Sequence, residues 1–402
     1  MLWVIFLDNK FFLAANSADG FYSTFDKSYD AADGWRAYII KGGPGTGKST
    51  LMKKLAKKAE SKSIEYELCP CSSDPDSLDA VIFPTLKRVI MDGTAPHIVE
   101  PKFPGVCEEI INLGQFWDGE KLIDNRDEIF SLTYKNSGLH KLAAMYIKTM
   151  GSVCKSNFSY ALAATDIEKC IDFAVKTAGK NIPVKKDTGK KWVRFLGGIT
   201  PKGALYYTDT INNYKNKIVL TDNFGAVSSI ILSALSDIAL SRGYEIIVIK
   251  NALLPNDITD ALLIPELSMC VCREYQNIKF ESNTRRIHYG RFTDKVRLNN
   301  NKQKIQFGKK IHRRLLQSAT ETLANAKSTH DELEKFYIDA MDFDKMKIYC
   351  DKFIDEFFGN KTAIISDSSG YLIFFESGVF YMPIELDDIY EFGYKNIKYS
   401  YK

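Results

Sequence analysis

A run of glycines that ends in a lysine and a serine is the pattern in this sequence with the most specific chemistry. Its nine residues are Gly42, Gly43, Pro44, Gly45, Thr46, Gly47, Lys48, Ser49 and Thr50. They match the phosphate-binding pattern G-x-x-x-x-G-K-[ST], in which successive backbone N–H groups and the N-terminal end of the following helix face an anion. Lys48 is expected to reach the β- and γ-phosphates, and Ser49 to place its hydroxyl on Mg²⁺. The pattern predicts binding of a nucleoside triphosphate together with Mg²⁺.

A second magnesium-binding side chain is expected at the end of a neighbouring buried strand. The apolar run Arg88 to Met91 ends in Asp92, which we predict to hold Mg²⁺ with Ser49 and to form the catalytic pair with Lys48. Gly93 follows Asp92 where many nucleotide hydrolases have a glutamate, so the sequence assigns no catalytic base.

Other polar residues near this region have two interpretations each. Asp74, Asp76 and Asp79 follow the predicted strand Ile64 to Leu68, where they would either position water or cap a helix. His97 would either contact a phosphate or substrate or make a local hydrogen bond. The chain contains no Asn-Lys-x-Asp or Thr-Lys-x-Asp stretch of the kind that reads guanine, which favours ATP over GTP.

The loop requires a strand before it and a helix after it, and the sequence provides both. Trp35 to Ile40 is aromatic and β-branched, as expected for a strand, and Ser49 to Glu60 has helical periodicity.

The same order of features returns about 180 residues later, which predicts an internal duplication. Phe12 to Gly20 corresponds to Phe195 to Gly203, and the Asp-Ala…Pro-x-Leu segment that begins at Asp79 corresponds to the one that begins at Asp260. The second loop spans Asp222 to Ser229.

Substitutions in the second loop remove the features that bind phosphate. Asp222 replaces Gly42 and adds a negative charge, Val227 replaces Gly47, and Ser228 replaces Lys48. Arg273 stands where the first copy has Asp92. We therefore expect one working nucleotide site, in the first half.

Each α/β segment is followed by a long, charged pattern of helical spacing, from about Gly105 to Ala178 and from about Asn299 to Phe358. The predicted fold class is α/β, with tandem duplicated P-loop NTPase-like domains, mainly parallel sheets and a helical hairpin after each. The predicted boundaries are 1–180 for the intact domain, 190–360 for the degenerate one and 361–402 for a strand-like tail of unassigned role. The segment between the domains is rich in Pro, Gly and Lys and is expected to be exposed.

Composition excludes few function classes. The chain has 402 residues, is 45% apolar and carries a net charge of +4. This small net charge makes nucleic acid an unlikely partner and does not indicate binding to an anionic membrane. The basic stretch from Lys302 to Arg314 is either a solvated helix face or a contact for nucleic acid or acidic protein. The eight cysteines are expected to be free thiols, and with no recognisable signal sequence the protein is expected to be cytoplasmic.

Taken together, Phe12 to Gly20, the glycine loop, Cys71 to Asp79 and Asp92 to His97 resemble an uncharacterised bacterial family of duplicated P-loop ATPase-like proteins. The resemblance covers most of residues 10 to 360, and it implies ATP binding and hydrolysis without naming a substrate. In that family the later copy also tends to keep a GKS-type loop, from which this chain departs.

Three functions remain open on sequence alone. The leading hypothesis is an ATPase with one active and one degenerate lobe, whose contact changes with nucleotide state and which can have a protein partner. The alternatives are a small-molecule or nucleotide kinase and a non-catalytic ATP-sensing scaffold.

Overall fold

The computed structural model describes residues 9–95, 98–274, 280 and 284–359, and the backbone of three strands between residues 363 and 382. The chain divides into two compact units, residues 1–342 and residues 343–402. The first unit contains the α/β parts of both predicted halves.

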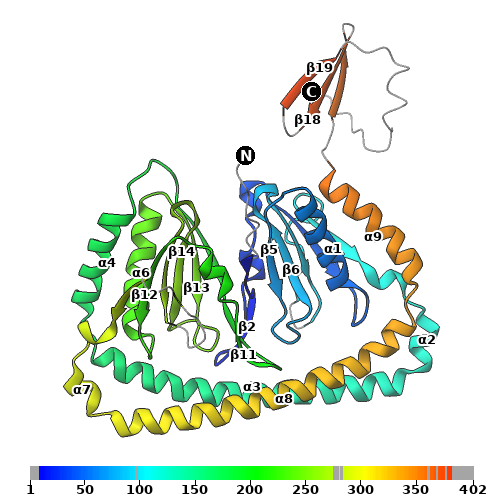
Figure 1. The fold of residues 1–402 in the computed structure, drawn as a ribbon. Coiled ribbons are helices and arrows are strands. Elements are labelled where there is room, and N and C mark those ends of the chain that lie inside the picture. The colour runs from blue at the N-terminus through cyan, green and yellow to red at the C-terminus, as the bar shows by residue number, and fades with distance from the viewer. Residues whose placement is uncertain are drawn as a thin grey trace. The chain divides into compact units, whose positions relative to one another are not determined.

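Two six-stranded sheets form the framework of the first unit (Figure 1). The strands of the first sheet, in spatial order, are β1 Asn9–Lys10, β5 Glu67–Pro70, β6 Leu78–Phe83, β7 Arg88–Asp92, β4 Arg36–Lys41 and β8 Glu108–Asn112. Those of the second, in the corresponding order, are β9 Lys190–Arg194, β13 Glu245–Lys250, β14 Thr259–Ile264, β15 Met269–Arg273, β12 Asn216–Thr221 and β16 Arg285–His288. Each has three parallel pairings and two antiparallel ones, at the same places. The predicted duplication is therefore confirmed at the level of topology.

The apolar composition of the inner strands explains why both sheets are covered on their two faces. All six residues of β6 and all six of β14 are buried, as expected for strands with no solvent-facing side. Helix α1, Lys48–Ser61, packs on the first sheet and α6, Ala226–Ser241, on the second. One cluster of buried side chains contains residues of both sheets, including Trp35 and Trp192, whose rings are 5.4 Å apart.

Equivalent residues of the two halves meet where the halves join. Phe12 and Phe195 exchange two backbone hydrogen bonds, of 2.8 and 3.0 Å, and each precedes a short hairpin. The hairpins are β2 Ala14–Ser17 with β3 Gly20–Ser23, and β10 Gly197–Thr200 with β11 Gly203–Tyr206. Beside them, Arg194 forms a buried ion pair with Glu67 of the other half at 3.2 Å. Because removing either partner would leave a buried charge uncompensated, this pair ties the halves together.

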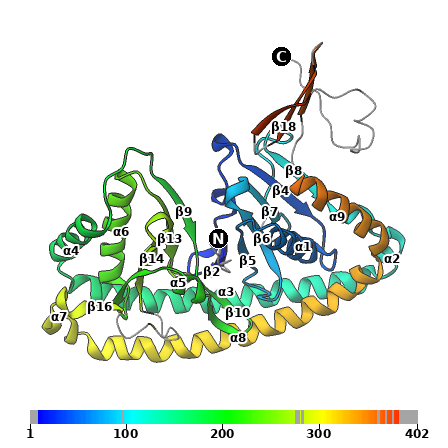
Figure 2. The same ribbon diagram turned by 45° about the horizontal axis from the view of Figure 1, so that its top comes forward.

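The long helices are exchanged between the halves rather than folded back as hairpins. Helices α3, Arg126–Ala163, and α8, Lys302–Asp339, have 38 residues each and run side by side along both sheets (Figures 1 and 2). At about 1.5 Å per residue each is about 57 Å long, which carries the chain beyond its own sheet. Helix α4, Ile167–Asn181, consequently packs on α6 of the second half. The expected pairing of helices within each half is wrong for α3 and α4.

Backbone pairings secure this exchange at both ends of the helix pair. Thr165, after α3, pairs with Thr293 of the second half, and Met341, after α8, pairs with Trp117 of the first half. The helices approach closely where they cross, since a Cβ on Gly308 would lie 2.8 Å from side-chain atoms of Asn157.

The first predicted helical stretch, from about Gly105, begins too early, whereas the second, from about Asn299, agrees with the start of α8 at Lys302. Residues 108–112 and 285–288 form β8 and β16, which extend each sheet beside the strand that precedes the loop. Short helices follow, α2 Gly119–Asp124 and α7 Lys295–Asn299, capped by Asp118 and Asp294. Strands of four or five residues with a single buried apolar side are difficult to distinguish from amphipathic helix by periodicity.

The second unit contains α9, Phe343–Phe358, and an antiparallel sheet of β17 Ala363–Asp367, β18 Gly370–Phe375 and β19 Gly378–Met382. This confirms the strands predicted in the tail. All eight cysteines are free thiols. Among the described residues, no helix combines the length and apolar character needed to cross a bilayer.

Candidate nucleotide site

The glycine loop connects the end of β4 to the start of α1, as the sequence predicts. Gly45 and Gly47 adopt the left-handed conformation, with φ of 67° and 78°, which side chains other than glycine rarely tolerate. Thr46 is buried, and its hydroxyl donates to the carbonyl oxygen of Gly43 at 2.9 Å. A Cβ on Gly42 would lie 2.7 Å from that hydroxyl. The glycines are therefore required by the curvature of the loop.

The side chain of Lys48 folds back onto the first residues of the loop. Its ammonium group donates to the carbonyl oxygens of Gly42 at 2.8 Å and Gly43 at 2.7 Å. The first turn of α1 contains no acidic side chain that would compete for its N-terminal end. Cation and helix end together form an anion-attracting site.

Asp92 lies at the end of β7, which is hydrogen-bonded to β4 with Asp92 opposite Ile40. One carboxylate oxygen is 3.7 Å from the Lys48 ammonium, and the other accepts from the backbone N–H and the hydroxyl of Thr94. Burial raises the pKa of the Asp92 carboxyl, and Lys48 and Thr94 oppose the rise. The structure thus brings together Lys48 and Asp92, as predicted.

Ser49 has a structural contact that the sequence did not predict. Its hydroxyl oxygen accepts the N–H of Leu78 at 3.0 Å, and Ser229 accepts the N–H of Thr259 at the same distance in the second half. One lone pair of the Ser49 oxygen remains for a cation. These matched contacts align Ser49 with Ser229, but the left-handed glycine directly before each helix aligns Gly47 with Gly225 and not, as predicted, with Val227.

The donor set fits Mg²⁺ that arrives with a nucleotide. In the described part of the chain, no three His, Cys, Asp or Glu side chains are grouped as a metal site. Mg²⁺ is usually held by one or two protein ligands with phosphate oxygens and water, and Ser49 and Asp92 are sufficient for that role.

The other acidic candidates have different surroundings. Asp76 is exposed and pairs with Lys202, so it does not contribute to the loop. Asp74 accepts the hydroxyl of Ser77 and is 3.6 Å from Lys327 of α8. Asp79 is buried, and its charge also raises the pKa of Asp92. His97 lies outside the described residues.

The second loop is filled by its own carboxylate. Asp222 is buried, and its two oxygens accept the N–H of Phe224 at 3.0 Å, the N–H of Ser228 at 2.9 Å and the Ser228 hydroxyl at 3.1 Å. Helix α6 begins at Ala226, two residues before Ser228. The loop amides that would face phosphate are thus partly engaged by Asp222.

Two further charged residues of the second copy, Arg273 and Asp260, form an ion pair with each other. The Arg273 guanidinium is 2.8 Å from the Asp260 carboxylate, and Asn251 donates to the same carboxylate. At the corresponding positions the first copy has Asp92 and Asp79. The first site therefore keeps two carboxylates and one ammonium group, whereas the second has a closed ion pair.

The last turns of α8 cover the first loop. A Cβ on Gly45 would lie 2.7 Å from Ile338 and 3.1 Å from the carbonyl oxygen of Glu334, and a Cβ on Gly43 would lie 3.3 Å from Tyr337. The ring of Trp117 packs against that of Tyr337 in a tilted arrangement, with ring centroids 5.6 Å apart and an interplanar angle of 53°. No local sequence signal identifies these residues, because their position follows from the exchange of the long helices.

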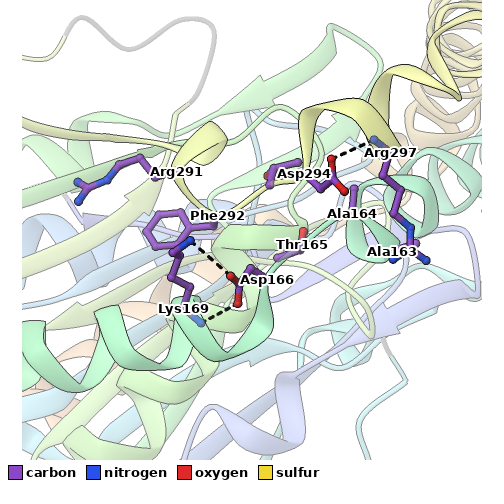
Figure 3. A pocket seen from close by; sticks show the side chains of 10 residues that line it. Ala163, Ala164, Thr165, Asp166, Lys169, Arg291, Phe292, Asp294 and Arg297 are labelled. Carbon is purple, nitrogen blue, oxygen red and sulfur yellow. Dashed lines mark hydrogen bonds and ion pairs between the residues drawn. The ribbon is translucent and has the colours of Figure 1, made fainter.

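A cavity of about 360 Å³ lies elsewhere, at the junction of α3, α4 and α7 (Figure 3). Its carboxylates, Asp166 and Asp294, already accept backbone N–H groups as helix caps, and Lys169 pairs with Asp166. It lies apart from the glycine loop and adds no residue to the nucleotide site.

Comparison with protein-family models, with curated proteins and with solved structures finds no match to this chain.

Proposed function

We propose that the protein binds ATP with Mg²⁺ at residues 42–50 and hydrolyses it, and that the second half is a partner lobe without nucleotide. The observation that carries this proposal is the contrast between the two loops. In the first, the Lys48 ammonium lies beside the Asp92 carboxylate at 3.7 Å. In the second, the Asp222 carboxylate occupies the amides of Phe224 and Ser228.

Binding would require Lys48 to exchange its partners. Its ammonium would leave the carbonyl oxygens of Gly42 and Gly43 for the β- and γ-phosphates, which are stronger, charged acceptors. Mg²⁺ held by Ser49 and Asp92 would neutralise charge that develops on the phosphates. Asp92 in turn gains a cation that offsets the cost of burying it.

Nucleotide state would be communicated to the second half through α8. Glu334, Tyr337 and Ile338 contact the glycines of the loop, and Lys327 reaches Asp74 beside it. A phosphate bound in the loop would therefore either alter the contact between the loop and α8 or require that contact to adjust. This supports the proposal that the two lobes respond to ATP as a pair.

Isothermal titration calorimetry with Mg²⁺ and ATP tests the binding site. We expect one ATP per chain, loss of binding in Lys48→Ala and unchanged binding in Ser228→Ala, its counterpart in the second loop. Equal losses in the two variants would overturn the assignment to a single site.

Hydrolysis is tested separately, by single-turnover phosphate release at protein concentrations well above that of ATP. The proposal expects release that depends on Asp92. ATP that is bound but not cleaved would indicate the sensor alternative, and phosphate transferred to an added metabolite would indicate the kinase alternative.

A further inference from the structure

The charges of α8 are separated along its length. Residues 302–320 contain six cations and no acidic residue, whereas residues 321–339 contain five acidic residues and two lysines. The six cations are Lys302, Lys304, Lys309, Lys310, Arg313 and Arg314, and all six are exposed. A net charge of +4 over the whole chain conceals this concentration.

Helix stability does not explain this arrangement. Acidic side chains stabilise the N-terminal end of a helix and basic ones the C-terminal end. The first turn of α8 has no acidic residue and its last turn no basic one. Its counterpart α3 follows the rule at its N-terminal end, with Asp127 and Glu128 in the first turn, although its last turn also has no basic residue. The basic half of α8 is thus unfavourable for the helix and absent from its duplicate.

The cations form one face. At about 100° per residue, all but Lys304 lie within an arc of about 140°, over about 18 Å of helix. The opposite face, with Ile305 and Ala319, is buried. In the described part of the chain, the ion pairs of α8 are those of Lys327, in its other half.

A groove of about 450 Å³ lies next to this face, between α8 and α3. It is lined by two aromatic side chains, Tyr160 and Phe307, and by the amides of Asn157 and Gln303. The Lys304 ammonium lies 5.5 Å from the centre of the Tyr160 ring. Aromatic rings beside cations are the elements that bind unstacked bases.

We propose that this basic face and groove bind single-stranded nucleic acid, with phosphates on the cations and a base against Phe307 and Tyr160. An acidic protein would favour a larger exposed apolar centre, and beside this face, in residues 302–320 of α8, Phe307, 66% exposed, is the single exposed large apolar side chain. A membrane would require an exposed apolar stripe, but that of α8 faces the protein. Interfaces with nucleic acid are polar and strongly positive, as this face is.

Fluorescence anisotropy with labelled 20-nucleotide oligo(dT) and oligo(U) tests the proposal, at 50 and 200 mM salt. The test variant changes Lys302, Lys310, Arg313 and Arg314 to Gln, which keeps helix propensity. We expect affinity to fall at least about tenfold and the salt dependence to weaken by about three counterions.

A matched variant controls for net charge. It changes Lys57, Lys58, Lys176 and Lys180 to Gln, which are four exposed helical lysines outside α8, and it should bind like the wild type. Equal losses in both variants would overturn the assignment to α8, as would absence of binding by the wild type at 50 mM salt.

Phe307→Ala tests the groove, because truncating one stacked aromatic side chain is expected to weaken binding about 5- to 150-fold. The same variant should bind a DNA duplex as the wild type does. Unchanged binding of single strands would overturn the role of the groove.

Competition identifies the polyanion. Oligo(dT) should displace the probe at much lower charge concentration than polyglutamate or vesicles containing 30% phosphatidylserine. Equal competition by polyglutamate would favour an acidic protein, and by vesicles a membrane, and either would overturn the proposal. Lys48→Ala should retain binding without ATP, so this experiment does not depend on the proposed ATPase.

Discussion

The carboxylate of Asp222 accepts hydrogen bonds from two backbone amides of the second loop, and we predict that removing this side chain leaves a site that binds an inorganic anion. Asp222 accepts three hydrogen bonds, from the N–H groups of Phe224 and Ser228 and from the Ser228 hydroxyl, while being 4% exposed. Bonds to a charged group contribute about 1.5–3 kcal/mol each, and water entering the vacated space would recover part of that. We expect Asp222→Ala to lower the free energy of unfolding by about 3–5 kcal/mol.

Added phosphate should restore part of this stability. A ligand that binds only the folded state at tenfold its dissociation constant contributes about 1.4 kcal/mol. Thermal and urea denaturation would be followed with and without phosphate, in a Lys48→Ala background so that the first loop does not respond. The expected result is a larger gain for Asp222→Ala than for the background chain.

Asp294→Ala provides the control, because Asp294 also accepts two backbone N–H groups but does so at an exposed helix end. It should lose only about 1 kcal/mol and recover little with phosphate. A stable Asp222→Ala chain, or one that phosphate does not stabilise more than the control, would refute the interpretation that Asp222 substitutes for phosphate.

Two further predictions concern the first site. Burial raises the pKa of Asp92, so ionising this carboxyl lowers the stability of the folded protein as pH rises from the ordinary aspartate pKa through the raised one. Asp92→Asn should therefore raise the melting temperature of the nucleotide-free protein at pH 7 and weaken Mg²⁺-dependent ATP binding. A lower melting temperature would contradict this reasoning. Gly45→Ala places a Cβ 2.7 Å from Ile338 on a backbone with φ of 67°, so it should lower stability by about 1–2 kcal/mol or more and speed amide exchange in the last turns of α8. Adding Ile338→Ala should recover part of the loss, and additive losses would argue against that contact.

Sequence patterns predicted the elements whose signals are local. The strand, loop and helix around Lys48 are where the pattern places them, and Asp92 ends the strand beside the loop. The loss of a phosphate site in the second loop was expected from Asp222, but its hydrogen bonds to Ser228 were not. That contact depends on α6 beginning at Ala226. The sequence alignment does not show this helix start, because the two loops differ in length.

The features that sequence reasoning missed depend on long-range packing. Periodicity identifies α3 as a helix with an apolar side, but it does not specify whether that side meets its own half or the other. The covering of Gly45 by Ile338 follows only from the exchanged helices. Net charge averaged over the chain likewise concealed the separation of charge along α8.

Hydrogen exchange of the whole protein, measured with and without Mg²⁺ and ATP, tests the central claim most directly because it reports on both loops in one sample. The account predicts slowed exchange of amides in residues 42–50 and no change in residues 222–229. Slowing confined to residues 222–229, or no slowing in either loop at millimolar ATP, would contradict it.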